Sequence, residues 1–181
     1  ARDIYIEGTV ELIECDLFTN KQVAQISIIC PRPYFKAVND LVTVFSDVSP
    51  MFSFPFAISE SGIEFSAITV NVRKSIVNVG DVETGVVIRL FAIGTVVNPI
   101  LYDVMKRTHM QLNVTISAGD LIVINTNVGE KSIELVRNGV ATNALGHMTP
   151  DSTWFKLEAG DNVFTYSADS GNSNLQITFT S

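Results

Sequence analysis

Histidine and cysteine are scarce in this chain, with two of each among 181 residues. His109 and His147 have no cysteine or second histidine at metal-ligand spacing. No nucleophile elbow, zinc-protease motif or phosphate-binding loop occurs either. Each histidine is therefore interpreted as a surface loop residue, and we expect neither a metal site nor a cofactor.

Carboxylates are present, but the sequence does not assemble them into a site. Asp81 with Glu83, or Asp151 with Glu158, could supply the two carboxyl groups of a glycosidase, yet nothing brings either pair together. Residues 169–174 offer three oxygen ligands around a glycine, but a polar turn explains them better than a calcium loop, which is more acidic. We expect no catalytic residue and no enzyme.

Basic residues are few as well. The 12 Lys and Arg stand against 19 Asp and Glu, which gives a formal net charge of −7. The largest basic clusters are the pairs Arg73-Lys74 and Lys106-Arg107, so no phosphate-binding patch is visible. Sequence-specific binding of nucleic acid is not expected.

No long apolar run is uninterrupted. The richest, residues 41–58, contains Asp47, Pro50 and Pro55, which excludes a membrane-spanning helix. The chain also begins without Met and enters an apolar stretch at once, which indicates a piece of a longer protein with a first domain missing.

Cys15 and Cys30 both lie in β-prone segments, outside any Cys-x-x-Cys frame. They form either one disulfide or two buried thiols in a reducing compartment, and the second interpretation is favoured.

Apolar residues, by contrast, are abundant. They make up 46% of the chain against 17% charged residues, and the mean hydropathy is +0.29. Either the core is generous or partner proteins cover part of the apolar surface.

Alternation of apolar and polar residues predicts strands with one buried face. The apolar positions are Met110, Leu112, Val114 and Ile116 in one segment and Leu175, Ile177 and Phe179 in another. Turns are expected at Lys106-Arg107-Thr108, at residues 127–130 and above all at Asn138-Gly139, a strong hairpin signal. These patterns predict an all-β antiparallel fold, a sandwich or barrel, with little helix.

Three Gly-Asp pairs precede β-prone runs, at Gly80-Asp81, Gly119-Asp120 and Gly160-Asp161. Glycine supplies the positive φ of a tight corner, and aspartate can bond the backbone two residues on. The pairs are predicted to be corners that start strands. Their spacing of about 40 residues resembles a propeller repeat, but the surrounding residues are not self-similar.

Aromatic residues suggest two kinds of surface. The lone Trp154, in the predicted strand 154–157, is interpreted as a core anchor, with sugar stacking by Trp154 and Tyr166 as the weaker alternative. Phenylalanines of the stretch 45–56 are the candidate interface with partner proteins, and Pro55 makes their strand an edge strand. These candidate interface residues are Phe45, Phe52, Phe54 and Phe56.

Pro31 and Pro33 mark a boundary, because two prolines in three residues disfavour both helix and central strand. Residues 1–32 are expected to hold the closing strands of an incomplete N-terminal domain and a linker, and residues 33–181 a β-sandwich. Tyr34, Val38, Leu41 and Phe45 have helical spacing, but an extended segment is as consistent with the residues between them.

Four segments together resemble the distal tail protein (Dit) family, siphovirus-type phage tail components. They are Gln25 to Phe35, Phe54-Pro55-Phe56, Ile76 to Gly85 followed by Asn98-Pro99, and Ser152 to Asn162. None is specific alone, and their order over about 150 residues carries the resemblance. It implies an N-terminal domain that forms a hexameric ring and a galectin-like or jelly-roll-like C-terminal β-sandwich.

The resemblance also implies a role without chemistry. The protein is expected to be a structural virion protein at the tail tip or baseplate, present in the host cytoplasm during assembly. Its implied partners are the tail tube protein, the tail-associated lysin and the receptor-binding protein, within a homo-hexamer. The alternative is a carbohydrate-binding module for host-surface glycans.

Overall fold

The computed structural model describes residues 3–15, 20, 23–38, 41–44, 46–50, 66–70 and 73–181, of which 46–50 and 66–70 are described by their backbone alone. The chain divides into two compact units, residues 1–40 and 41–181. Proline spacing had placed the boundary after residue 32. No helix in the described ranges is long and apolar enough to cross a membrane.

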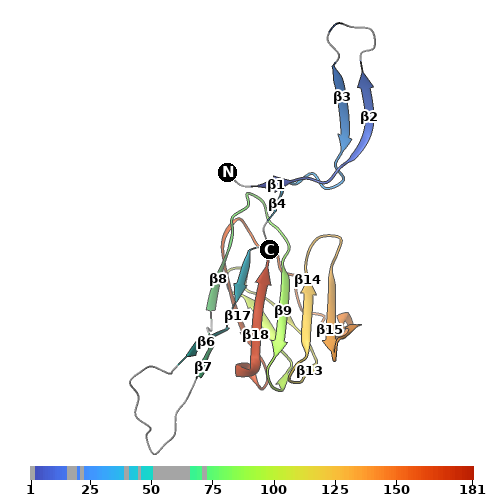
Figure 1. Cartoon of the computed structure of the whole chain (residues 1–181). Helices are drawn as coiled ribbons and strands as arrows, with labels where there is room; N and C mark the ends of the chain where they lie inside the picture. The colour runs from blue at the N-terminus through green and yellow to red at the C-terminus, as the bar shows by residue number, and fades with distance from the viewer. Residues whose placement is uncertain are drawn as a thin grey trace, which may run out of the picture. The chain divides into compact units, whose positions relative to one another are not determined.

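The first unit contains four short strands, labelled in Figure 1. They are β1 (Ile4–Tyr5), β2 (Thr9–Cys15), β3 (Ala24–Ile29) and β4 (Lys36–Ala37). β2 and β3 form an antiparallel hairpin with a register shift between Val10 and Leu12, and β1 pairs with β4. Strands β1, β2 and β3 therefore precede the two prolines.

The second unit is a sandwich of two antiparallel sheets, as the sequence predicted. One sheet has the order β12-β11-β17-β8, and the other the order β16-β15-β14-β9-β18-β5. β10 pairs with β13, and β6 with β7. The strands that form the two large sheets are β5 (Val42–Val44), β8 (Arg73–Asn78), β9 (Val87–Ala92), β11 (Ile100–Asp103), β12 (Thr108–Gln111), β14 (Leu121–Asn125), β15 (Ser132–Arg137), β16 (Val140–Asn143), β17 (Gly160–Ser167) and β18 (Leu175–Thr180). The remaining elements are β6 (Ser46–Pro50), β7 (Ser66–Val70), β10 (Val96–Val97), β13 (Thr115–Ile116) and the 3₁₀ turns η1 (Leu145–His147) and η2 (Asn172–Asn174).

The core lies between the two large sheets. Its centre is an aromatic cluster in which the ring centroid of Phe164 lies 5.3 Å from that of Phe155 and 5.1 Å from that of Phe179. Alternate residues of the facing strands fill the rest, including Ile88, Leu90, Ile122, Ile124 and Ile177, each 1% exposed or less. This one-sided burial is what the period-2 pattern predicted.

The alternating segment 110–116 buries Met110, Leu112 and Ile116 and partly buries Val114, but it is not one strand. β12 ends at Gln111, and β13 begins at Thr115 and pairs with β10. Between them Val114 N donates to Leu112 O at 3.1 Å, the bond of a γ-turn. A period-2 pattern does not distinguish a straight strand from one broken in this way.

The predicted turns are confirmed. Asn138 and Gly139 join β15 to β16 with φ of 52° and 78°, as a type I′ turn requires. Gly129, with φ of 83°, lies in the turn from β14 to β15. Between β11 and β12, Asp103 Oδ1 accepts from the N–H groups of Met105 and Lys106, and Arg107 has φ of 55°.

Two of the three Gly-Asp corners need glycine. Gly119 and Gly160 have φ of 90° and 89°, whereas Gly80 is not among the residues with positive φ. Neither Asp120 nor Asp161 forms the expected hydrogen bond to the backbone of the residue two positions later. Asp120 instead accepts from Ser117 N at 2.8 Å, and Asp161 accepts from the hydroxyl of Ser75 at 3.2 Å.

Two local predictions are settled by tertiary contacts. Residues 154–157 are not a strand, and only Leu157 forms a bridge, with Thr84. Their burial comes from packing against the core and not from a sheet. Among the described residues from Tyr34 to Val44 the helical spacing corresponds to no helix, since β4 and β5 are extended backbone.

Candidate interaction sites

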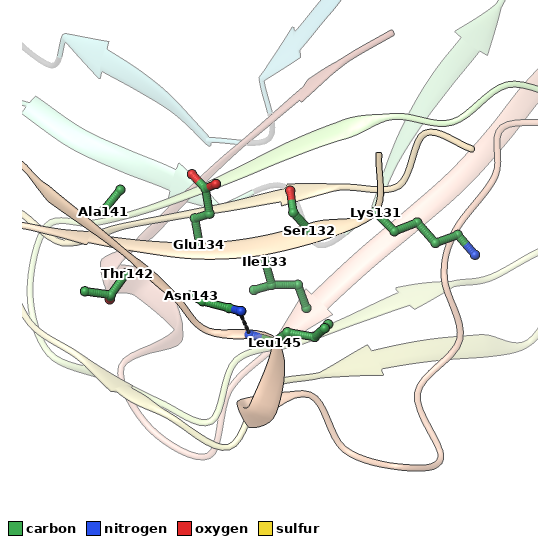
Figure 2. Close-up of a pocket in the computed structure, with 8 residues that line it drawn as sticks. All are labelled: Lys131, Ser132, Ile133, Glu134, Ala141, Thr142, Asn143 and Leu145. Carbon is green, nitrogen blue, oxygen red and sulfur yellow. Dashed lines mark hydrogen bonds between the residues drawn. The ribbon is translucent and has the colours of Figure 1, made fainter. Parts of the chain in front are cut away.

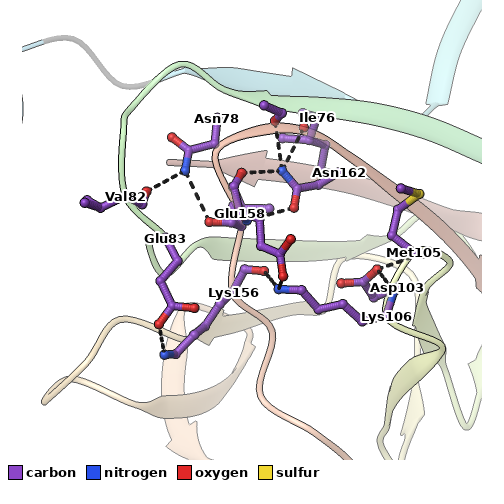
Figure 3. Close-up of polar contacts among 12 residues, drawn as sticks. Ile76, Asn78, Val82, Glu83, Asp103, Met105, Lys106, Lys156, Glu158 and Asn162 are labelled. Carbon is purple, nitrogen blue, oxygen red and sulfur yellow. Dashed lines mark hydrogen bonds and ion pairs between the residues drawn. The ribbon is translucent and has the colours of Figure 1, made fainter.

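Two buried asparagines connect the loops at one end of the sandwich (Figure 3). Asn78, at the end of β8, donates through Nδ2 to the carbonyls of Val82 and Leu157 and accepts from Gly80 N. Asn162, in β17, accepts from Glu158 N through Oδ1 and donates to the carbonyls of Glu158 and Gly160. The two side chains thus bind backbone N–H and C=O groups of loop residues that lie outside the strands.

Two lysines extend this network at the surface. Lys156 Nζ pairs with Glu83, and Lys106 Nζ lies 3.3 Å from Glu158 Oε1 while it donates to Lys156 O at 2.8 Å. The hydrogen bond from Lys156, followed by its positive charge, lowers the pKa of Glu83 below the usual range. The network is a set of satisfied bonds, not an open site.

The carboxylates considered as glycosidase pairs make separate contacts. Glu83 and Glu158 bind different lysines, and Asp151 Oδ2 lies 3.2 Å from His109 Nε2. The hydroxyl of Thr149 is the main cause that lowers the pKa of Asp151, and His109 contributes less. The second histidine, His147, contacts Asn113 O through Nδ1 at 3.1 Å. Glu83, Glu158, Asp151 and the two histidines therefore each have a structural partner.

Asp120 forms the most buried ion pair among the described residues. Its side chain is 6% exposed and accepts from Arg137 Nη2 at 2.6 Å and from Nε at 3.0 Å. This bidentate bond is the main cause that lowers the pKa of Asp120, and it raises the pKa of Arg137. The pair fixes the corner before β14 to the end of β15.

Trp154 and Tyr166 differ in their accessibility to a sugar. Trp154 packs partly buried against the core, and Lys131 Nζ lies 5.4 Å from its ring centroid. Tyr166 is only 4% exposed, so its ring faces are in contact with protein, and burial raises the pKa of its hydroxyl. Of the two, only Trp154 offers any ring surface for stacking.

A shallow pocket of about 220 Å³ lies beside β15, β16 and η1 (Figure 2). Ile133, Ala141 and Leu145 supply its apolar lining, and Lys131 and Glu134 contribute charges of opposite sign. The amide of Asn143 accepts from Leu145 N at 2.9 Å, which fixes that side chain. The charges at its rim belong to the exposed surface of the sheet edge.

The hairpin β2–β3 exposes apolar side chains on both faces. Leu12 and Ile13, neighbours on opposite faces of β2, are 49% and 59% exposed, and Ile28 on β3 is 56% exposed. A hairpin of two strands has no interior of its own. Cys15 and Cys30 are free thiols. Cys15 is exposed and Cys30 is partly buried, so the prediction that both thiols are buried is wrong.

The candidate interface residues Phe45, Phe52, Phe54 and Phe56 lie outside the described residues. Within the described ranges, no group of three or more His, Cys, Asp or Glu is placed to hold a metal ion.

In the segment considered for calcium, Asp169 accepts from Asn98 Nδ2 at 2.7 Å. That segment connects β17 to β18, one strand in each large sheet, and is therefore a crossover and not a hairpin.

A family model matches residues 79–181, which is most of the sandwich. Its description is "Siphovirus-type tail component, C-terminal domain" (SPP1_Dit). The chain belongs to this family.

One solved structure supports the fold of this chain, and two others resemble it more weakly. The crystal structure of the SPP1 Dit protein superposes with a TM-score of 0.65 at 10% identity, over 96% of this chain and 57% of that one. Two structures of the phage P2 baseplate, in its activated conformation with Ca and with Sr, have TM-scores of 0.47 and 0.45 at 11% and 12% identity. They cover 98% of this chain and 63% and 64% of theirs. No curated protein matches the chain.

Two of the segments that resembled the family meet in space in this tail component. β8 pairs with β17 so that Asn78 lies opposite Gly160 and Ile76 opposite Asn162. Asn78 joins the loop before Gly85 to Leu157 in the loop before Gly160, and Asn162 bonds within that second loop and, at 3.4 Å, to Ile76 O of β8 (Figure 3). The sequence shows both segments but does not single out Asn78 or Asn162 as the residues that connect them. Nothing local signals a bond across about 80 residues.

Proposed function

We propose that this tail component is a structural part of the hub at the distal end of a siphovirus-type tail. The match of residues 79–181 to the family carries the proposal. The fold likeness to the SPP1 protein, whose crystal structure is described as a paradigm of the hub adsorption apparatus in phages that infect Gram-positive bacteria, supports it. This chain spans 57% of that protein's length, so the role is proposed for the protein to which the described sandwich contributes.

In this role the sandwich acts by rigid presentation of its surfaces, without catalysis. Homo-hexamers would bind the tail tube protein on one side and the tail-associated lysin and receptor-binding protein on the other. The exposed apolar side chains of the hairpin β2–β3 support contacts of residues 1–32 with further protein surface, since a two-stranded hairpin cannot bury them by itself. The protein would reside in the virion and, during assembly, in the host cytoplasm.

Immunogold electron microscopy tests the position. Antibodies raised against residues 79–181 are expected to label one end of the tail, opposite the capsid, in particles from a strain that carries this gene. Label along the tube or on the capsid would contradict a hub role. Particles from a strain without the gene provide the control for antibody specificity.

The Phe-rich stretch remains the proposed contact with partner proteins. Replacement of Phe52 and Phe54 by Ser is expected to raise solubility and to leave the unfolding of the sandwich unchanged, because interface residues are exposed in the free subunit. Light scattering and urea unfolding measure the two effects. Cooperative loss of folding would instead place these phenylalanines in the core.

Glycan binding is the alternative function, and the partly exposed ring of Trp154 is the observation that keeps it open. A glycan array with the full chain, followed by Trp154→Ala, separates it from a purely structural role. Binding that is lost on substitution while the circular dichroism spectrum is retained would establish the alternative. No binding above background would favour the structural role.

A further inference from the structure

The outer face of the six-stranded sheet carries an apolar row among polar residues. Facing away from the core, β9, β14 and β15 place Phe91, Leu121 and Val136 side by side in one row of the ladder. Phe91 is 40% exposed, and the other two are partly exposed. Outward positions of a β-sandwich are ordinarily polar. Figure 1 shows β9 and β14 adjacent in the middle of this sheet.

Two opposite charges interrupt this apolar face at symmetric positions. In the neighbouring row, Val123 of β14 lies opposite Arg89 on one side and opposite Glu134 on the other. Both charged residues are exposed. Arg89 donates to the hydroxyl of Thr180 at 3.0 Å, and neither Arg89 nor Glu134 has an ion pair with a described residue. One positive and one negative charge thus flank Val123 at equal spacing.

We propose that this face binds the same face of a second copy of the chain, with a two-fold axis that lies between the two faces, parallel to β14 and over Val123. A rotation about that axis exchanges the β9 side of one copy with the β15 side of the other. Arg89 then lies over Glu134 of the second copy, and the reverse pair forms as well. The same rotation places Phe91 over Val136 of the second copy and Leu121 over Leu121 of the second copy. The charged row and the apolar row are therefore complementary in the same arrangement.

The size of the face sets the expected strength. Five strands about 4.8 Å apart and five residues of about 3.4 Å give a face of roughly 24 by 17 Å per copy. Its burial on both copies, roughly 800 Å² for flat faces, lies below the about 1,200 Å² of stable interfaces and in the range of weak contacts, so we expect a dissociation constant on the order of 10–100 μM. A two-fold contact closes on two copies, whereas ring contacts are head-to-tail. This two-fold contact is separate from any contact between neighbours in a hexameric ring, so the inference does not rest on the proposed function.

Sedimentation velocity of the full chain, from about 1 to 300 μM, tests the contact. The unmodified chain is expected to show a monomer–dimer equilibrium. Arg89→Glu, or Glu134→Arg alone, places like charges opposite each other and should weaken dimerisation at least about tenfold. The double exchange Arg89→Glu with Glu134→Arg restores both pairs in reverse and should return the dissociation constant to within about threefold.

Arg73→Glu is the matched control, because Arg73 is exposed on β8 in the other sheet and the net charge changes equally. It should leave dimerisation unchanged. A chain that stays monomeric throughout the concentration range would overturn the proposal. So would a dimer that is indifferent to both single charge reversals, because association would then use another surface, such as the β2–β3 hairpin. Circular dichroism verifies that each variant is folded.

Discussion

Amide side chains determine how the loops at one end of the sandwich are held. An asparagine can donate two hydrogen bonds and accept others through one short side chain, so it can satisfy backbone groups of two loops at once. Asn162 is 3% exposed and uses both ends of its amide, as does Asn78, which is 8% exposed. Backbone groups that leave a ladder still need partners, and these residues supply them.

Asn162→Ala is expected to destabilise the sandwich by about 2–4 kcal/mol, because buried carbonyls and the N–H of Glu158 lose their partners. Urea unfolding followed by the fluorescence of the lone Trp154 measures this change. Asn113→Ala is the control. Asn113 is exposed, and its substitution should change the free energy of unfolding by less than about 0.5 kcal/mol. Equal effects of the two substitutions would contradict a structural role for the Asn162 amide.

The ion pair of Asp120 with Arg137 predicts a pH dependence. The hydrogen bond from Arg137 lowers the pKa of Asp120 in the folded chain, so the folded state binds fewer protons than the unfolded state in acid. The ion pair therefore stabilises the folded chain at pH values above the usual aspartate pKa. This stabilisation is lost as the pH falls through that pKa toward the lowered pKa of Asp120. Asp120→Asn should therefore be less stable than the unmodified chain at pH 7, with a difference that shrinks by pH 3. A constant difference would exclude this linkage.

At the scale of elements, turn signals were predicted well and strand continuity was not. Asn138-Gly139 requires positive φ at both residues, and few other dipeptides provide it, so the turn is visible in the sequence. Continuity of the segment 110–116 depends on which strands lie beside it. β12 pairs with β11 in one sheet and β13 with β10 in another, information that the alternating pattern does not contain.

Gly139 and Gly146 provide a matched pair of substitutions at this scale. An alanine Cβ would meet no atom within 4 Å at either position, but only Gly139 has positive φ, at 78°. Gly139→Ala should cost about 1 kcal/mol from backbone strain alone. Gly146→Ala should be neutral, or stabilising by up to about 1 kcal/mol, through the lower entropy of the unfolded chain. Thermal unfolding compares them, and equal midpoints would show that the φ of Gly139 carries no cost.

At the scale of the whole chain, the apolar composition has two explanations. Part of it fills the sandwich core, where the phenylalanine cluster is almost fully buried. Another part is exposed: large apolar residues of β2 and β3 are solvated, as are Phe91, Val42 and Val44 on the outer face of the six-stranded sheet. From the sequence alone a generous core and exposed apolar surface are alternatives, and the chain has both, in different parts.

The two compact units predict independent behaviour. Because Trp154 lies in the second unit, its fluorescence reports the unfolding of the sandwich alone. Leu12→Ser with Ile28→Ser, on the first-unit hairpin, should lower the binding of an apolar dye and leave the Trp154 transition within about 0.5 kcal/mol. Phe164→Ala in the core, by comparison, should cost about 3–5 kcal/mol. A hairpin variant that shifts the Trp154 transition by as much would contradict the independence of the units.

The sequence by itself determined the class of the fold, the positions of its tight turns and the buried face of its regular strands. These follow from local rules: period-2 alternation selects one face of a sheet, and glycine or asparagine permits positive φ. Only the tertiary structure decided which loops the asparagines join, which arginine binds Asp120 and which charges flank Val123. Those partners lie between 11 and about 80 residues apart in the chain, and only the pairing of strands brings them together.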